Sequence, residues 1–119
     1  MLDVMPLQTA VDALADRLRS LPQSALARGA AAEGLALARE LARRAQRIEC
    51  PGREPHELPD AGMFAAGDQL AVAGHDLAEA LRAAAAGPAD EAAAQGVEKA
   101  PAEELAEAVR LVGETAGRC

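Results

Sequence analysis

The sequence predicts an all-α fold, a four-helix bundle built on a long antiparallel helical hairpin. Alanine and leucine, the strongest helix formers, dominate the chain. Two long stretches repeat apolar or glycine residues every three or four positions, so each stretch has a narrow seam on one side of a helix. The first seam is Ala30, Gly34, Leu37, Leu41, Ala45 and Ile48, and the second is Met63, Gly67, Leu70, Gly74, Leu77, Leu81 and Ala84. The two seams are expected to face each other across a Pro/Gly-rich loop.

The first helix is expected from about Pro6 to Ser20. Proline is favoured as a first helical residue, because its missing N–H would have no partner there. Leucines and valine then follow in steps of four, three and four residues, and Leu21-Pro22 ends the pattern.

The hairpin is expected to join helices at about 24–49 and 60–86. Ser24 and Asp60 are suitable N-caps, and Gly87-Pro88 ends the second helix. Gly29 and Gly34 are both expected inside the helix at 24–49, although a glycine in a helix interior costs about 1 kcal/mol relative to alanine. Both glycines then indicate close packing or a gentle bend.

The remaining chain predicts a weaker segment and a last helix. Residues 89–100 are small and acidic, typical of a weak helix or a weakly ordered linker. Pro101 starts the last helix, and residues 113–119 are expected to fray. Residues 1–119 thus make one domain, most simply up-down-up-down, with the packing order of the first and last helices left open.

The core is expected to be thin. The chain has no Trp or Tyr and only one aromatic residue, Phe64. Burial yields about 25 cal/mol per Å² of apolar area, and alanine offers little of it. Close approach of helices at Gly34, Gly67 and Gly74, and self-association of the chain, are expected to add stability.

Composition also bears on location and partners. A net charge of −7 disfavours nucleic acid and anionic membranes. The apolar run at 83–89 is shorter than the roughly 20 residues of a membrane helix, and no Sec-type signal is visible. Two cysteines, Cys50 and Cys119, make no disulfide framework, so the sequence predicts a cytoplasmic protein. Its alanine and arginine usage is typical of a high-GC bacterial genome.

Residues that could carry chemistry do not form a recognisable set. Cys50, His56, His75 and Cys119 are metal-ligand types but lack CxxC or HxxxH spacing. The Glu103-Glu104 pair has no accompanying ExxH element. The sequence therefore predicts a protein that is not an enzyme and that has no cofactor, no metal and no small-molecule ligand.

Two residues are regulatory candidates. His75 is followed by Asp76 and Glu79, where a histidine phosphotransfer domain would carry a basic residue and a glycine. Its expected partner is therefore Glu79, one turn along the helix. For Cys50, beside Pro51, an incidental free thiol is favoured over a modestly activated thiol or a cross-link between two copies. A His- or thiol-dependent regulatory bundle is one alternative function.

An arginine stripe ends the first hairpin helix, where the helix dipole favours cations. Its members are Arg39, Arg43, Arg44 and Arg47. Their expected partners within the chain are Glu54, Glu57, Asp60 and Asp68. For a contact outside the chain, a partner protein with an acidic patch is favoured over nucleic acid.

The leading prediction is a non-enzymatic bundle that acts through protein–protein contact or self-association, with a protein partner or a second copy. Methionine and aromatic side chains are typical of contact sites. The candidate interface residues are Met63, Phe64, Leu70, Leu77 and Leu81.

Residues 24–86 also resemble the small WXG-type substrates of bacterial type VII secretion in size and seam pattern. That family pairs as helical hairpins without a cleaved signal peptide, so the resemblance implies export. The loop at 50–59 carries no Trp-x-Gly, and the tail carries no tyrosine.

Overall fold

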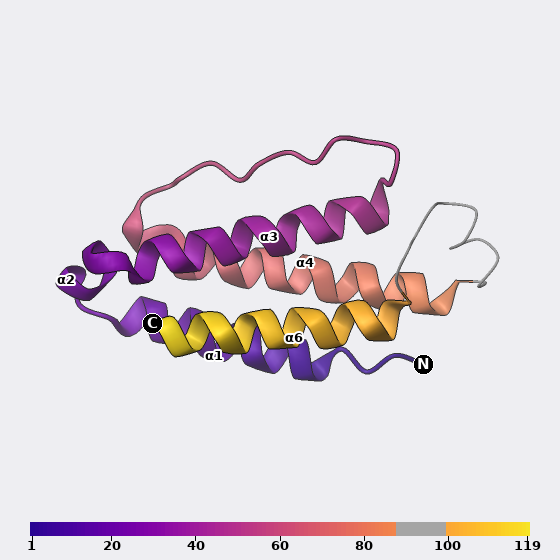
Figure 1. Cartoon of the computed structure of the whole chain (residues 1–119), viewed down its shortest axis with the longest axis horizontal. Coiled ribbons are helices and arrows are strands. Elements are labelled where there is room, and N and C mark those ends of the chain that lie inside the picture. Colours follow the sequence, from indigo (N-terminus) through magenta and orange to yellow (C-terminus); the bar gives the residue numbers. More distant parts are fainter. Residues whose placement is uncertain (88–99) are drawn as a thin grey trace.

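The computed structural model describes residues 1–87 and 100–119, and this part of the chain folds as an all-α bundle (Figure 1). The four main helices are α1 (Met5–Ser20), α3 (Ala31–Glu49), α4 (Ala66–Ala86) and α6 (Pro101–Arg118). Short turns α2 (Gln23–Ala25), η1 (Leu26–Ala30) and η2 (Met63–Ala65) precede α3 and α4. The predicted four-helix architecture is confirmed. Among residues 1–87 and 100–119, none of the helices combines the length and the apolar character that a membrane span requires.

Helix α1 forms at the predicted position. Pro6 lies in its first turn, and the Asp3 carboxylate accepts a hydrogen bond from the N–H of Met5 at 3.0 Å. The apolar face of α1 is buried through Leu7, Val11 and Leu18. Pro22 follows soon after the end of the helix, because it cannot continue an α-helical hydrogen-bond pattern.

The first long helix is interrupted at Gly29. This residue has a φ of 149°, a conformation that residues with a Cβ rarely adopt. The chain therefore makes two short turns before α3 begins at Ala31, whereas the sequence predicted a continuous helix over 24–49. Gly34 does lie inside α3.

Helices α3 and α4 form the long central pair, but they run in the same direction (Figure 1). Residues 50–62 return along α3: the Arg39 Nε donates to the Leu58 carbonyl at 2.8 Å, and Gln46 exchanges two hydrogen bonds with the His56 backbone. At about 3.3 Å per residue this segment can span about 40 Å, whereas the 19 residues of α3 rise only about 28 Å. The antiparallel direction and the loop boundary at Pro59 are therefore corrected.

The start of α4 is later than predicted. The Asp60 carboxylate accepts the N–H of Gly62 at 2.8 Å, which forms a turn ahead of η2. Asp60 is therefore not the N-cap of the long helix, which begins at Ala66. The Asx-type turn satisfies this carboxylate locally, before the helix starts.

Helices α1 and α6 pack against the central pair in the opposite direction. Near the start of α3, Gly34 lies beside Leu18, which is close to the end of α1. In α6, Glu104 pairs with Arg44 and Arg118 pairs with Glu33. The result is a bundle with one long crossover connection, in place of the simple up-down-up-down order.

The core is a single cluster of leucine, valine and alanine side chains drawn from all four helices. Three glycines allow the helices to approach closely. A Cβ on Gly34 would lie 2.7 Å from Leu18 Cδ1, a Cβ on Gly67 would lie 2.9 Å from the Ala15 carbonyl oxygen, and one on Gly74 would overlap Val11. The predicted close approach at these glycines is confirmed. Gly67 and Gly74 face α1.

The C-terminal tail is helical as far as Arg118, whereas the sequence predicted fraying over 113–119. Thr115 is buried, and the Arg118 Nε lies 2.9 Å from Glu33 Oε2 on α3. These contacts hold the last turns of α6 on the bundle. The predicted linker at 89–100 lies outside the described residues, except for Ala100, which directly precedes α6.

Candidate functional site

Phe64 lies in η2 at one end of the bundle, and its side chain is exposed to solvent. It is 69% exposed, although it is the only aromatic residue of the chain. Met63 beside it is partly buried and packs against the core. Gly62, with a φ of 98°, lets the chain turn into η2 immediately before them.

The three leucines of the predicted interface belong to the core. Leu70, Leu77 and Leu81 are among the largest fully buried side chains of the bundle. They cannot reach a partner while α4 keeps its place. Met63 and Phe64 are the two predicted interface residues that lie at or near the surface.

A second exposed apolar side chain, which the sequence analysis did not single out, lies on α4. Val72 is 62% exposed and follows Phe64 by eight positions in the sequence. Val72 lies midway between the seam residues Leu70 and Gly74, two positions from each. This spacing places it on the side of the helix away from the seam, which could have predicted its exposure.

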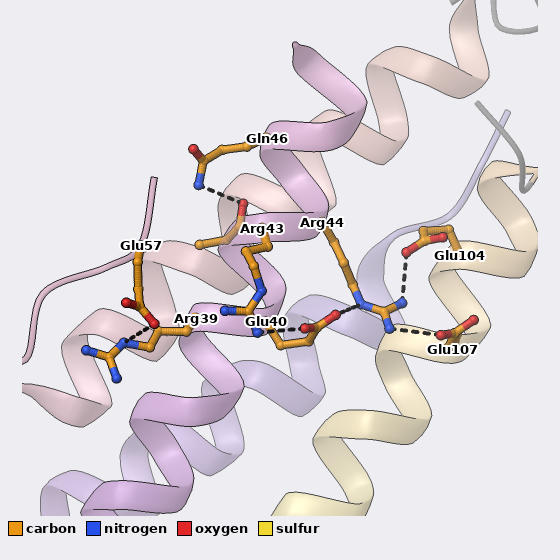
Figure 2. Close-up of polar contacts among 9 residues, drawn as sticks. Arg39, Glu40, Arg43, Arg44, Gln46, Glu57, Glu104 and Glu107 are labelled. Carbon is orange, nitrogen blue, oxygen red and sulfur yellow. Dashed lines mark hydrogen bonds and ion pairs between the residues drawn. The ribbon is translucent and has the colours of Figure 1, made fainter. Parts of the chain in front are cut away.

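A cluster of five charged side chains joins α3 to α6, and we call it the Arg44 cluster (Figure 2). The guanidinium of Arg44 donates from Nε to Glu40, from Nη1 to Glu104 and from Nη2 to Glu107, at 2.7, 2.8 and 2.8 Å. Arg43 donates to the other oxygen of Glu40 at 2.8 Å. The Arg44 side chain is only 14% exposed.

Helix geometry explains how the cluster assembles. Glu40 and Arg44 are one turn apart on α3, and Glu104 and Glu107 are one turn apart on α6, so each pair projects from one side of its helix. The five members are Glu40, Arg43, Arg44, Glu104 and Glu107, with three negative charges and two positive ones.

The ion pairs shift two pKa values against the effect of burial. Burial by itself would raise the pKa of Glu40, but hydrogen bonds from Arg43 and Arg44 outweigh it and leave this pKa below its usual value. Burial would lower the pKa of Arg44, yet hydrogen bonds to Glu107 and Glu40 raise it overall. Both groups therefore stay charged at neutral pH.

The arginine stripe is divided among different partners. The Arg39 Nε lies 3.7 Å from Glu57 Oε1, which is one of the predicted pairings. Asp68 instead pairs with Arg19 of α1 at 2.8 Å. In the arginine stripe, Arg39, Arg43 and Arg44 all contact acidic side chains, so the stripe is not a continuous free basic surface.

The pairing of Glu104 and Glu107 with Arg44 could not be predicted from the sequence, because the partners lie 60 or more positions apart.

His75 bridges two helices. Its Nε2 lies 2.8 Å from Asp12 Oδ1, so the imidazole connects α4 to α1. The predicted partner Glu79 pairs with Arg82 instead. Both His75 and Asp12 are well exposed, with side-chain exposures of 44% and 54%. The pair is a surface contact between helices.

The two cysteines are free thiols at opposite ends of α3. Cys50 is exposed just after this helix, whereas Cys119 is partly buried at the end of α6, near Glu33. Burial raises the pKa of the Cys119 thiol, and the charge of Glu33 raises it further. About 24 Å of helix lies between Glu33 and Glu49, so the two thiols cannot form an intramolecular disulfide.

Within residues 1–87 and 100–119, no group of three or more His, Cys, Asp or Glu side chains is placed to hold a metal ion. Comparison of the chain with protein-family models, with curated proteins and with solved structures finds no match.

Proposed function

We propose that this chain is a non-enzymatic helical bundle that acts through protein–protein contact, with the Phe64 end of the bundle as the contact surface. The exposed side chain of Phe64 is the observation that carries the proposal. An aromatic ring offers a large apolar area that gains free energy when a partner removes it from water. Aromatic residues are accordingly enriched at the centre of protein interfaces.

The surroundings of Phe64 support the same proposal. The preceding residue, Met63, packs against the core, which anchors the segment that carries Phe64. Asp60 and Asp68 lie four residues before and after Phe64 and are exposed. An apolar centre with charged neighbours is the usual composition of a contact surface.

Self-association is the simplest form of this contact, and the solution mass tests it. Size-exclusion chromatography with light scattering should use refractive-index detection, because the chain has no Trp or Tyr. With reductant present, so that Cys50 cannot cross-link two copies, we expect the wild-type chain to be a dimer. We expect the Phe64→Ala chain to be a monomer at the same concentration.

Val72→Ala is the matched control, since it truncates a similarly exposed apolar side chain on α4, the helix that directly follows η2. We expect it to leave the dimer intact. A dimer that Phe64→Ala leaves unchanged would place the contact on another surface. A wild-type monomer at every concentration would rule out self-association.

The parallel direction of α3 and α4 bears on the resemblance to WXG-type secretion substrates. That resemblance rests on a helical hairpin, in which consecutive helices run in opposite directions. Here residues 50–62 carry the chain back along α3 before α4 begins. The shared geometry is therefore lost, and we do not extend the proposal to export. A cytoplasmic location stays a prediction.

A further inference from the structure

Residues 54–62 form no regular secondary structure and return along α3 toward the start of α4 (Figure 1). The central part of this segment, which we call the strap, is Pro55, His56, Glu57, Leu58 and Pro59. A proline restricts the residue before it to extended conformations, so the two prolines favour an extended strap. An extended chain of this type leaves its carbonyl groups available to donors on a neighbouring surface.

Two side chains of α3 bind the main chain of the strap. The Gln46 Nε2 donates to the His56 carbonyl at 3.0 Å, and the Gln46 Oε1 accepts the N–H of His56 at 2.7 Å. The Arg39 Nε donates to the Leu58 carbonyl at 2.8 Å. Arg39 and Gln46 are seven positions apart, which is about two helical turns, so they lie on one side of α3.

Helix α4 adds a third donor. The Gln69 Nε2 donates to the Pro59 carbonyl at 2.8 Å, so the strap is held by both helices of the central pair. All these bonds go to backbone groups, and a different extended chain carries the same groups. The two helices therefore present a surface that recognises an extended main chain.

Two side chains of the strap give this recognition a preference. Leu58 is partly buried and packs against the core. The Glu57 Oε1 lies 3.7 Å from the Arg39 Nε, so an acidic residue precedes the apolar one. A matching chain has an acidic residue, then an apolar residue, then a proline that keeps it extended.

The attachment of the strap is weak for a segment of this length. The hydrogen bonds that Gln46 and Gln69 make with it are exposed, and water competes with such bonds, so each stabilises the contact only slightly. The chain tethers the strap at both ends, and this tether raises its local concentration at the surface. A segment on another molecule can replace it when its own contacts compensate for that advantage.

We infer that the face of α3 and α4 that carries Arg39, Gln46 and Gln69 is a binding site for an extended, proline-containing peptide of a partner protein, and that the strap occupies this site as an internal ligand. The observed occupant and the positive charge of Arg39 define the chemistry of the partner, an acidic–apolar–proline sequence such as Glu-Leu-Pro. The inference uses none of the residues of the proposed contact at Phe64 and does not rest on it.

An NMR titration of the isotope-labelled full chain tests the site. The probe is a free peptide with the sequence of residues 53–60, capped at both ends. The chain carries Glu57→Lys and Leu58→Asp, which remove the ion pair and the apolar contact of the strap but leave the three helix donors in place. We expect this variant to bind the peptide about tenfold more tightly than wild type, because the wild-type strap competes for the site. The shifted amides should lie over 39–46 and around Gln69.

Gln46→Ala, added to this variant, should weaken peptide binding about tenfold, because it removes both bonds to one peptide group. Gln23→Ala is the matched control, since Gln23 is an exposed glutamine on α2. We expect it to leave peptide binding unchanged. A peptide with aspartate in place of its leucine should not bind.

Several results would overturn the inference. One is the absence of peptide-induced shifts in the variant at millimolar peptide, and another is equally tight binding after Gln46→Ala. Equal binding to wild type and to the variant would mean that the strap does not occupy the site. A wild-type dimer that the free peptide dissociates would assign the site to the strap of a second copy instead of a partner protein. If the double substitution lowers helical circular dichroism, Leu58→Ala alone should still bind the peptide more tightly than wild type.

Discussion

At the residue scale, the glycines of this chain fall into two classes that the sequence does not separate. Gly34, Gly67 and Gly74 lie where a Cβ would meet a neighbouring helix. Gly29 and Gly62 supply positive φ angles at turns. Gly113 has open space around it within α6. The local sequence shows only that each position lacks a side chain, and the neighbour that explains it lies elsewhere in the chain.

Substituting alanine at Gly74 and at Gly113 should have opposite effects on stability. A Cβ at Gly74 would lie 2.4 and 2.6 Å from the two Cγ atoms of Val11 and 3.0 Å from its Cβ, which cannot rotate away. We expect Gly74→Ala to destabilise the bundle by about 1–3 kcal/mol. Gly113→Ala should stabilise it by about 0.5–1 kcal/mol through helix propensity. Thermal unfolding followed at 222 nm measures both, and equal shifts would contradict the close approach.

At the element scale, local signals located helices better than they located breaks. Prolines at the starts of α1 and α6 marked both helices correctly. The break at Gly29 escaped prediction, because a glycine costs only about 1 kcal/mol inside a helix and so is compatible with either outcome. Helix α6 continues to Arg118 through the stretch 113–119 where fraying was expected, and there Thr115 and Arg118 make tertiary contacts that no local signal reveals.

The contact between α3 and α6 should depend on pH through Glu40. Its pKa is lowered in the folded chain, so its stabilising contribution is present above the ordinary value of 4.5 and is lost as the pH falls through the folded value. The groups around it are Arg43 and Arg44 on α3, with Glu104 and Glu107 of α6 across Arg44.

We therefore expect wild type to be more stable than Glu40→Gln at pH 7, with a difference that shrinks below about pH 4.5. Thermal unfolding at a series of pH values measures it. Glu103→Gln, at an exposed position, is the control and should behave as wild type. A difference between wild type and Glu40→Gln that stays constant from pH 7 to pH 3 would contradict the cluster.

At the scale of the whole molecule, one thin core joins four helices, and truncation within it should be felt throughout. Leu77 is fully buried in α4, whereas Val72 on the same helix is exposed. We expect Leu77→Ala to lower the free energy of unfolding by about 2–5 kcal/mol. Val72→Ala should change it by less than about 0.5 kcal/mol. Urea unfolding followed by circular dichroism distinguishes them, and an unaffected Leu77→Ala chain would refute the buried seam.

The sequence by itself determined the all-α class, the positions of α1 and α6 and the seam residues that become core, because helix propensity and apolar periodicity act over a few turns. Only the tertiary structure decided that α3 and α4 run in parallel, since a segment as long as 50–62 can either make a loop or return along a helix. It also decided that Arg44 meets Glu104 and Glu107, and that Phe64 lies outside while Leu70 and Leu77 lie inside. Such pairings depend on how distant segments pack, and that information is not local to any stretch of the chain.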